Sequence, residues 1–216
     1  MTKTSYLLLG GLLFTSGAAM AVEEPKYTVL SQVDDFELRH YDEQLVAQTW
    51  VTGDQNTASR EGFKILADYI FGNNTASNGE SSKISMTAPV TMQTETKKED
   101  GKSQKIAMTA PVSMQQADGK WCVQFTMPSQ YTMVTLPKPN NPNIMIKEIP
   151  AQTYGVIKFS GLAGNQKVAK KTEELQSWMQ KQKLPPTGEP ELARYNPPWT
   201  LPFLRRNEVI IAYQSK

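Results

Sequence analysis

The sequence is poor in the side chains that most often bind metals or act as nucleophiles. Its 216 residues include one cysteine, Cys122, and one histidine, His40. One cysteine excludes an internal disulfide framework and any multi-cysteine zinc or iron–sulfur site. One histidine excludes histidine-rich metal clusters and restricts any Ser–His or Cys–His catalytic pair to His40.

An excess of charge of one sign is also missing. Lys and Arg total 23 against 21 Asp and Glu, so the formal net charge is +2. Because nucleic-acid binders need a dense basic surface, this balance predicts that the protein has no nucleic-acid partner. Apolar residues make up 39% of the chain, charged residues 20%, and the mean hydropathy is −0.47. These values indicate a soluble globular protein rather than a disordered chain.

The motifs of the common enzyme classes are absent as well. The sequence contains no nucleophile elbow, P-loop, dinucleotide-binding fingerprint or zinc-protease helix. We therefore expect a protein that is not an enzyme. Two alternatives stay open: a pair of carboxylates that folding brings together, and a reactive thiol at Cys122.

Long apolar runs are missing except near the N-terminus. Lys3 precedes an apolar run at residues 6–14, and Ala19-Met20-Ala21 fits the small-residue rule for signal-peptide cleavage. The run is shorter than the roughly 20 apolar residues that a membrane span needs. Residues 1–21 are thus predicted to be a secretory signal peptide, which leaves an exported, periplasmic protein without stable membrane insertion. The alternative is that this segment is retained as an anchor.

Hydrophobic periodicity then predicts strands and a helix in the first half of the mature chain. Residues 27–51 are rich in β-branched and aromatic side chains, which predicts two strands broken near Asp34-Asp35. Possible helix caps follow at residues 54–57, and Gly72 marks the end of the helix. One helix face carries apolar residues at helical spacing: Phe63, Leu66, Ala67 and Ile70.

Two near-copies of one segment come next, at residues 83–93 and 105–115. Each alternates strictly, which predicts a strand with one buried face. The residues expected on the buried face of the first copy are Ile84, Met86, Ala88, Val90 and Met92. The two copies are predicted to pair as a hairpin joined by residues 94–104, with Pro89 and Pro111 at edges or bulges.

The second half of the chain shows a similar order of elements. Strands are expected at 121–127, 144–149, 153–159, 192–195 and 208–213. A helix is expected between the strands at 153–159 and 192–195, and Pro185-Pro186 ends it. The apolar face of this helix holds Val168, Thr172, Leu175 and Met179. The sequence therefore predicts an α+β fold of two pseudo-symmetric strand-strand-helix-strand-strand units, with residues 22–216 as a single domain. The alternative is that the halves look alike without being repeats.

Several of these stretches resemble one known family. They are residues 86–90, the copy of these at residues 108–112, and residues 125–129, 136–137, 159–161, 194–199 and 205–209. Together, over residues 27–213, they resemble the SOUL heme-binding family. The resemblance implies a distorted, largely antiparallel β-barrel with two flanking helices, an ion-pairing corner at residues 205–208, and non-catalytic binding of heme or a related tetrapyrrole. The family has no universally shared axial ligand.

A heme site needs an apolar slot, cationic or amide groups for two propionates and, optionally, an axial ligand. The slot is predicted beside the first helix, walled by Phe63, Leu66, Ile70, Met86 and Met108. Partners for the propionates are predicted to be Arg60 and Lys64, with Arg39, Lys83 and Lys105 as further candidates. The glycine turn at residues 161–164, before the second helix, is another candidate because helix N-termini attract anions.

His40 is the candidate for the heme iron. It shares a strand face with Phe36 and Leu38, so it is expected on the apolar side of its strand. The alternative is a core or rim histidine whose nitrogens are satisfied by protein groups. Burial of the macrocycle alone can supply the affinity even where the iron has no axial bond.

The function predicted from the sequence is therefore that of an exported heme or tetrapyrrole carrier or buffer. One alternative is a scaffold or interaction module of the same fold without a ligand. Another is a periplasmic Cu(I)-binding protein, because thioethers suit Cu(I). The thioethers concerned are those of Met86, Met92, Met108 and Met114.

Overall fold

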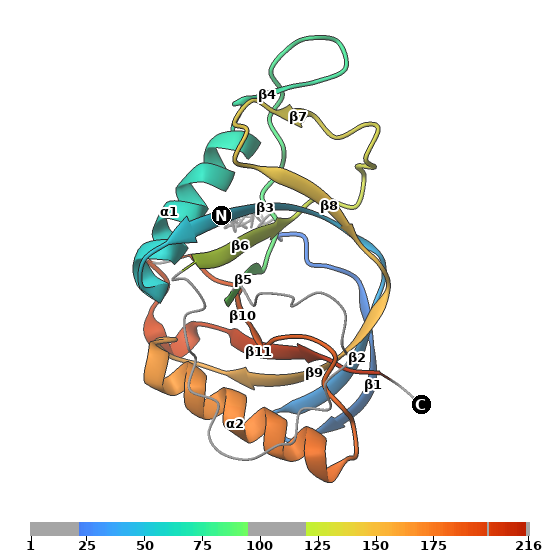
Figure 1. Cartoon of the computed structure of the whole chain (residues 1–216), viewed down its shortest axis with the longest axis vertical. Helices are drawn as coiled ribbons and strands as arrows, with labels where there is room; N and C mark the ends of the chain where they lie inside the picture. The colour runs from blue at the N-terminus through green and yellow to red at the C-terminus, as the bar shows by residue number, and fades with distance from the viewer. Residues whose placement is uncertain (1–21, 95–119, 198, 215–216) are drawn as a thin grey trace, which may run out of the picture.

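The computed structural model describes residues 22–94, 120–197 and 199–214, and Figure 1 shows the arrangement of the elements. In chain order the elements are β1 (Tyr27–Val33), β2 (Phe36–Tyr41), β3 (Gln44–Thr52), α1 (Gln55–Ile70), β4 (Asn74–Thr75), β5 (Val90–Thr94), β6 (Lys120–Thr126), β7 (Lys138–Pro139), β8 (Met145–Ile149), β9 (Gln152–Phe159), α2 (Asn165–Lys181), β10 (Glu191–Arg194), the 3-10 helix η1 (Pro202–Leu204) and β11 (Asn207–Ala212). Neither α-helix of the described part is long and apolar enough to cross a membrane.

Nine strands form one antiparallel sheet in the order β1-β2-β9-β11-β10-β5-β6-β3-β8. The order β9-β11-β10 in one half corresponds to β3-β6-β5 in the other, and β10 pairs with β5 where the halves meet. Strands also cross between the halves, since β2 of the first unit pairs with β9 and β8 of the second unit pairs with β3. This confirms the predicted α+β fold of two pseudo-symmetric units. The sheet curls into a half-barrel whose edges are β1 and β8 (Figure 1).

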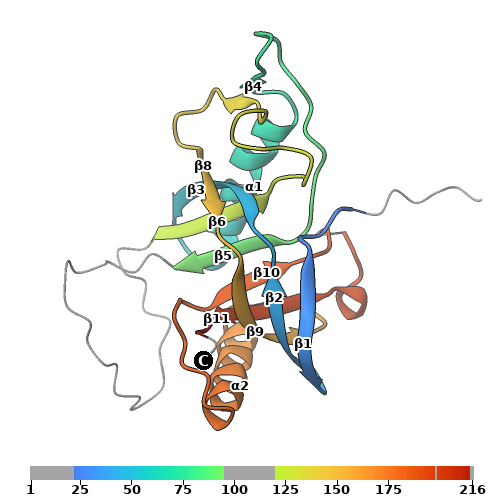
Figure 2. The ribbon, with the colours of Figure 1, turned by 90° about the vertical axis from the view of Figure 1, so that its right-hand side faces the viewer.

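Each helix covers one half of the sheet, and Figure 2 shows them at opposite ends of the molecule. Helix α1 packs on β3 and β6. It begins at Gln55 because the Asp54 carboxylate accepts hydrogen bonds from the N–H groups of Asn56 and Thr57, which selects Asp54 among the possible caps at residues 54–57. A Cβ at Gly62 would lie 2.5 Å from Cγ2 of Val123, so glycine lets the helix approach β6 closely.

Helix α2 packs on β9 and β11. Its four predicted core residues, Val168, Thr172, Leu175 and Met179, are all buried. The apolar stripe of a 3.6-residue period therefore located the packing face of this helix correctly.

The first near-copy departs from its prediction. Only residues 90–94 form a strand, and the residues before them lack regular structure apart from a bridge between Thr87 and Glu23. The alternation fails there because the backbone N–H groups do not bond to a neighbouring strand of the sheet. The N–H of Ile84 donates to the carbonyl of Ile70, the last residue of α1, and the N–H of Ala88 donates to the carbonyl of Glu23. Ile84 is consequently buried, whereas Met86, expected on the same face, is 37% exposed.

The expected hairpin between the two near-copies is also wrong for strand β5. Residues 90–92 of β5 pair with β6 on one edge and with β10 on the other, so neither edge of this stretch is left for a further partner. The second copy, residues 105–115, lies outside the described residues. The period-2 pattern identified a strand but not its neighbours, which are set by segments far away in the sequence.

The concave face of the half-barrel buries charge rather than a purely apolar core. On β2 the side chains of Glu37, Arg39 and Tyr41 are buried, and the alternate ones are half-buried toward α2. Arg39 donates hydrogen bonds to Glu37 (2.6 Å) and, through both terminal nitrogens, to Glu208 (2.8 and 2.9 Å). Glu208 also accepts hydrogen bonds from Arg206 (3.0 Å) and from Tyr195 (2.7 Å). The predicted ion-pairing corner is thus present.

Candidate functional site

The apolar face of α1 is filled by protein rather than open as a slot. Leu66 and Ile70 are fully buried in a core cluster that includes Phe125. Phe63 is partly buried against the same cluster, with its ring 5.4 Å from that of Phe125. Three of the predicted slot walls therefore contact other side chains over the described part of this face. Of the other two, Met86 is exposed to solvent and Met108 lies outside the described residues.

The remaining predicted heme contacts are not gathered at α1 either. His40 is half-buried on β2 and pairs with Thr153 of β9, in the half of the sheet that α2 covers. Lys83 and Arg60 are exposed, and Lys64, also exposed, bonds to Glu61 at 3.1 Å. Lys105 lies outside the described residues.

Arg39 is a correction to the expected partners of the propionates. Its side chain is 0% exposed and its guanidinium is occupied by Glu37, Tyr41 and Glu208. Burial opposes the charge, but hydrogen bonds and the charge of Glu208 outweigh it and raise the pKa of Arg39 above its usual value. A charge held this way is part of the fold and does not reach a ligand.

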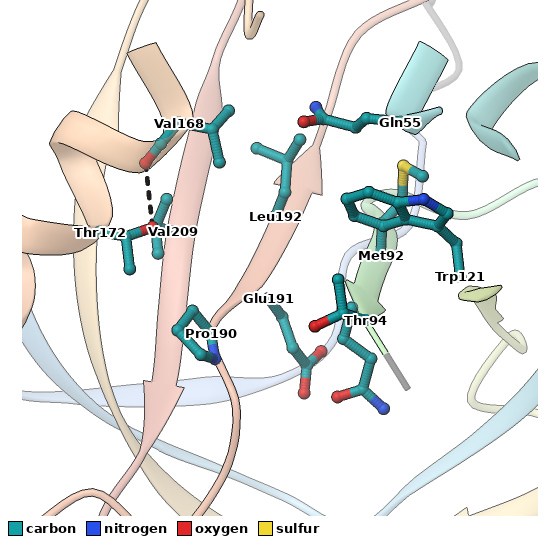
Figure 3. A pocket seen from close by; sticks show the side chains of 11 residues that line it. Gln55, Met92, Thr94, Trp121, Val168, Thr172, Pro190, Glu191, Leu192 and Val209 are labelled. Atoms are coloured by element: carbon teal, nitrogen blue, oxygen red, sulfur yellow. Dashed lines mark hydrogen bonds between the residues drawn. The ribbon is translucent and has the colours of Figure 1, made fainter. Parts of the chain in front are cut away.

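A small hollow lies at the seam between the halves, and Figure 3 shows its lining. Met92, Leu192 and Val209 come from the sheet, Gln55 from the start of α1 and Val168 from α2. The amide nitrogen of Gln55 donates to Ala163 (3.2 Å), while its buried oxygen has no hydrogen-bond partner. The volume is about 10 Å³, room for a single water molecule. A macrocycle does not fit there.

A larger hollow of about 230 Å³ lies where the N-terminal segment crosses the sheet. Four of its lining residues are acidic: Glu23, Glu24, Asp42 and Glu43. Hydrogen bonds from the hydroxyl and the N–H of Ser129 lower the pKa of Glu23, so this carboxyl stays ionised. The hollow is smaller than the roughly 300–1,000 Å³ of small-molecule pockets. Its negative charge would also repel the propionates of heme.

Glu191 marks the edge of the seam hollow on strand β10. Burial raises its pKa to about 7, and the charge of Lys147 opposes that rise only in part. This carboxyl therefore changes charge near neutral pH.

The described surface also carries a cluster of exposed apolar side chains, here called the apolar corner. Its members are 56% to 82% exposed. They are Leu162, Trp199, Leu201, Phe203 and Leu204. All but one belong to the connection between β10 and β11, which contains η1. Leu162 joins them because the neighbouring Gly161 donates to the carbonyl of Pro202 (2.9 Å).

Hydrogen bonds fix the shape of the apolar corner. Leu204 donates to Leu201 (2.9 Å), and Arg205 donates from its backbone to Pro202 (3.1 Å) and from its side chain to Thr200 (2.7 Å). At the base of the connection, Asn207 donates to Gly161 (3.0 Å). The apolar side chains therefore project from an ordered turn.

Cationic groups surround the apolar corner. The two segments that build it, residues 159–172 and 192–207, contain no Asp or Glu. Their cations are Lys167, Lys170, Lys171, Arg194, Arg205 and Arg206. Two of them are ion-paired with neighbouring carboxylates, Lys171 with Glu174 and Arg206 with Glu24 and Glu208. The N-cap of α2, Gly164, offers no side chain to the first N–H groups of the helix, so that end of α2 adds positive potential.

Arg194 ties the corner to α1. It donates to the Ser59 hydroxyl (2.9 Å) and to the carbonyl of Ala163 (3.2 Å). The predicted propionate contact Arg60 follows Ser59 and therefore lies at the same end of α1. The predicted glycine turn at residues 161–164 is part of the corner itself.

A family model described as SOUL heme-binding protein matches two stretches of the chain, residues 22–103 and 96–212. The chain belongs to the SOUL heme-binding protein family. The first match contains β1 to β5 with α1, and the second contains β6 to β11 with α2, so each match holds one of the two helices. No curated protein in the comparison matches the chain.

Solved structures share the fold of this SOUL protein at low sequence identity. The EcmrR C-terminal domain has a TM-score of 0.56 at 13% identity over 88% of this chain and 99% of that one. EcmrR in its complex with DNA gives 0.57 at 12% identity, over 85% of this chain and 59% of that one. A hydrolase from Listeria innocua gives 0.51 at 9% identity, over 86% and 94%. At these identities the likeness concerns the fold alone.

The apolar corner was missed as a site by the sequence reasoning. Residues 194–199 were identified only as a motif that resembles the family. The signal that could have found it is the largely apolar run from Trp199 to Leu204, which contains Pro202 and lies between two strands. Such a run cannot extend a sheet, and its side chains have to be covered by something else.

Proposed function

We propose that this protein binds a tetrapyrrole, heme in the first place, at the apolar corner, as an exported carrier or buffer without catalysis. The observation that carries the proposal is an ordered apolar surface bordered by cations in a member of the SOUL heme-binding family. Heme combines the same two properties, a flat apolar ring and two carboxylates. The two hollows described above fit it poorly, one by volume and the other by charge.

Burial of the apolar ring supplies micromolar binding when the cost of association lies at the low end of its range. Removing on the order of 500 Å² of apolar area from water contributes about 12 kcal/mol at ~25 cal/mol per Å². Association costs about 4–15 kcal/mol, and a micromolar complex requires about 8 kcal/mol net. A rigid turn keeps that cost low because few side chains lose freedom on binding. Contacts to the propionates then decide the orientation of the ring.

The groups that would hold the propionates belong to the start of α2. The Lys167 ammonium, at present bonded to the Ser160 carbonyl, lies there together with the uncapped N–H groups that follow Gly164. Arg60 stands on the neighbouring end of α1. When bound, heme would supply its iron and its visible absorption. The proposal assigns no axial ligand among the corner residues.

Export and a carrier role complete the proposal. They are supported by the signal-peptide pattern of residues 1–21 and by the absence, in the sequence, of the common catalytic motifs. Copper binding has weaker support. Of its four methionines, Met92 is buried in the core cluster of the α1 half and Met86 is exposed, while Met108 and Met114 lie outside the described residues.

The test is a hemin titration of the purified chain, followed by absorbance in the Soret region and by tryptophan fluorescence. The proposal expects saturable binding that Phe203→Ser weakens by about tenfold, as the loss of one buried aromatic contact implies. Val134→Ser is the matched control, because Val134 is 88% exposed and is not part of the corner. No Soret change at up to tens of micromolar hemin would refute the proposal and favour the ligand-free scaffold.

A further inference from the structure

We propose that the apolar corner also docks on the surface of an anionic phospholipid bilayer. The inference names a partner for the site of the proposed function and rests on that function for its biological sense, because tetrapyrroles partition into membranes. The docking itself needs no bound ligand. It is carried by three observations on the described residues: the exposed apolar area, the surrounding charge and the rigid turn.

The exposed apolar area of the corner is large for a soluble monomer. Five large side chains that are 56% to 82% exposed present on the order of 600 Å², at the upper limit of apolar patches on soluble monomers. They project from the tip of a turn rather than lining a groove. A projecting tip enters a soft interface more readily than it fits a concave pocket.

The side-chain types match the boundary between headgroups and acyl chains. Trp199 and Phe203 are aromatic, and the other three members are leucines. Tryptophan prefers that boundary, and leucine and phenylalanine enter the acyl layer. The composition of the corner is thus typical of a segment that lies in the interface.

The charge around the corner selects an anionic bilayer. The two flanking segments hold six cations, although the net charge of the whole chain is only +2. Glu174, Glu24 and Glu208 pair with Lys171 and Arg206, which leaves Lys167, Lys170, Arg194 and Arg205 outside these ion pairs. Lysine, which is depleted in protein–protein interfaces, supplies three of the six. Each cation near an anionic surface favours binding, so the charge is complementary to acidic headgroups.

The turn is ordered before it meets a partner. The bonds of Leu204 to Leu201 and of the Arg205 side chain to Thr200 hold η1 in place. Insertion then requires no folding of the segment, and the apolar side chains can enter the interface together.

The experiment uses the full chain without hemin and vesicles of phosphatidylglycerol and phosphatidylcholine, with bromine on the acyl chains. Bromine quenches an indole only inside the apolar layer, and residues 1–21 contain no Trp, so their own binding does not contribute. We expect quenching that is lost in Trp199→Phe. Trp50→Phe is the matched control, because Trp50 is 38% exposed on β3, and it should keep the quenching.

Two further arms test the apolar and the charged components. The double variant Phe203→Ser/Leu204→Ser should need at least about tenfold more lipid for half-maximal quenching. The parent chain should likewise need at least about tenfold more lipid when the vesicles contain phosphatidylcholine alone, because its cations then have no anionic headgroups to bind. Equal quenching by both kinds of vesicle would overturn the choice of an anionic surface.

Absence of quenching in anionic vesicles would overturn the docking proposal. So would a parent chain that is dimeric in solution and becomes monomeric in the double variant, because a second copy would then cover the corner. Hemin titrations without vesicles separate the two proposals. Soret binding without quenching rejects only the docking, and quenching without Soret binding rejects only the tetrapyrrole site.

Discussion

Removal of Arg39 tests whether the concave face depends on its buried charges. In Arg39→Met, the apolar chain fills part of the space, but Glu37 and Glu208 lose a shared partner at a site with almost no solvent. Breaking a buried ion pair from one side costs about 3–5 kcal/mol. Glu37 keeps Lys158, and Glu208 keeps Arg206 and Tyr195, so the lower end of that range applies.

The loss should depend on pH in a defined direction. Burial of Glu37 and Glu208 opposes their ionisation, but hydrogen bonds and nearby cations, Arg39 among them, hold both pKa values below the usual range. A lowered folded-state pKa stabilises the fold above the unfolded value near 4.5, and this contribution is lost as the pH falls through the folded value. Without Arg39 the folded pKa values rise. The difference between parent and variant should therefore be largest at pH 7 and shrink toward pH 4.

Urea unfolding at several pH values, followed by tryptophan fluorescence, measures both effects. We expect Arg39→Met to lower the free energy of unfolding by about 3 kcal/mol at pH 7, with a thermal midpoint lower by roughly 6–12 °C. Arg60→Met, on the exposed side of α1, should change the stability by less than about 0.5 kcal/mol. A loss below about 1 kcal/mol, or one that is the same at pH 4 and pH 7, would refute the reasoning.

Three other predictions concern single side chains. Burial raises the folded-state pKa of Glu191 to about 7, so its ionisation destabilises the fold as the pH rises from 4.5 to 7. Glu191→Gln should therefore raise the thermal midpoint at pH 8 and leave it nearly unchanged at pH 4. Equal shifts of the midpoint at the two pH values would contradict this. Lys167→Glu should weaken hemin binding about tenfold, whereas Lys138→Glu, at the exposed Lys138 of β7, should not, as titrations of both will show. His40→Ala should leave the Soret band of the hemin complex in place, because His40 lies on β2 beside Thr153, whereas the corner starts beyond Phe159 at the other end of β9; a shifted band would move the site to β2.

The helix faces and the repeat followed from the sequence because local pattern decides them. On α1, Leu66 and Ile70 stand one turn apart, and a 3.6-residue period turns both toward the sheet. The same argument holds for α2. The order of strand types along the chain also revealed two equivalent units, since each unit folds around its own helix.

Strand β2 shows where pattern reasoning stops. Its apolar residues Phe36 and Leu38 face α2 as expected, but the more deeply buried face carries Glu37 and Arg39. Arg39 is buried because Glu208, 169 residues later, supplies the opposite charge. No local sequence feature indicates such a distant partner, so the alternation of charged and apolar residues predicts the apolar face of β2 but not the burial of its charged face.

The apolar corner likewise depends on contacts between segments that are distant in the sequence. The connection from β10 to β11 stays short and ordered because Asn207 and Pro202 bond to Gly161, at the end of the strand that leads to α2. That contact pairs the N–H and the carbonyl of Gly161, while the side chains of Trp199 and Phe203 remain exposed. An apolar run that is fixed at its base and uncovered at its tip gains free energy from any apolar partner that reaches it. The local sequence shows the run, but only the folded chain shows that nothing in the described part covers it.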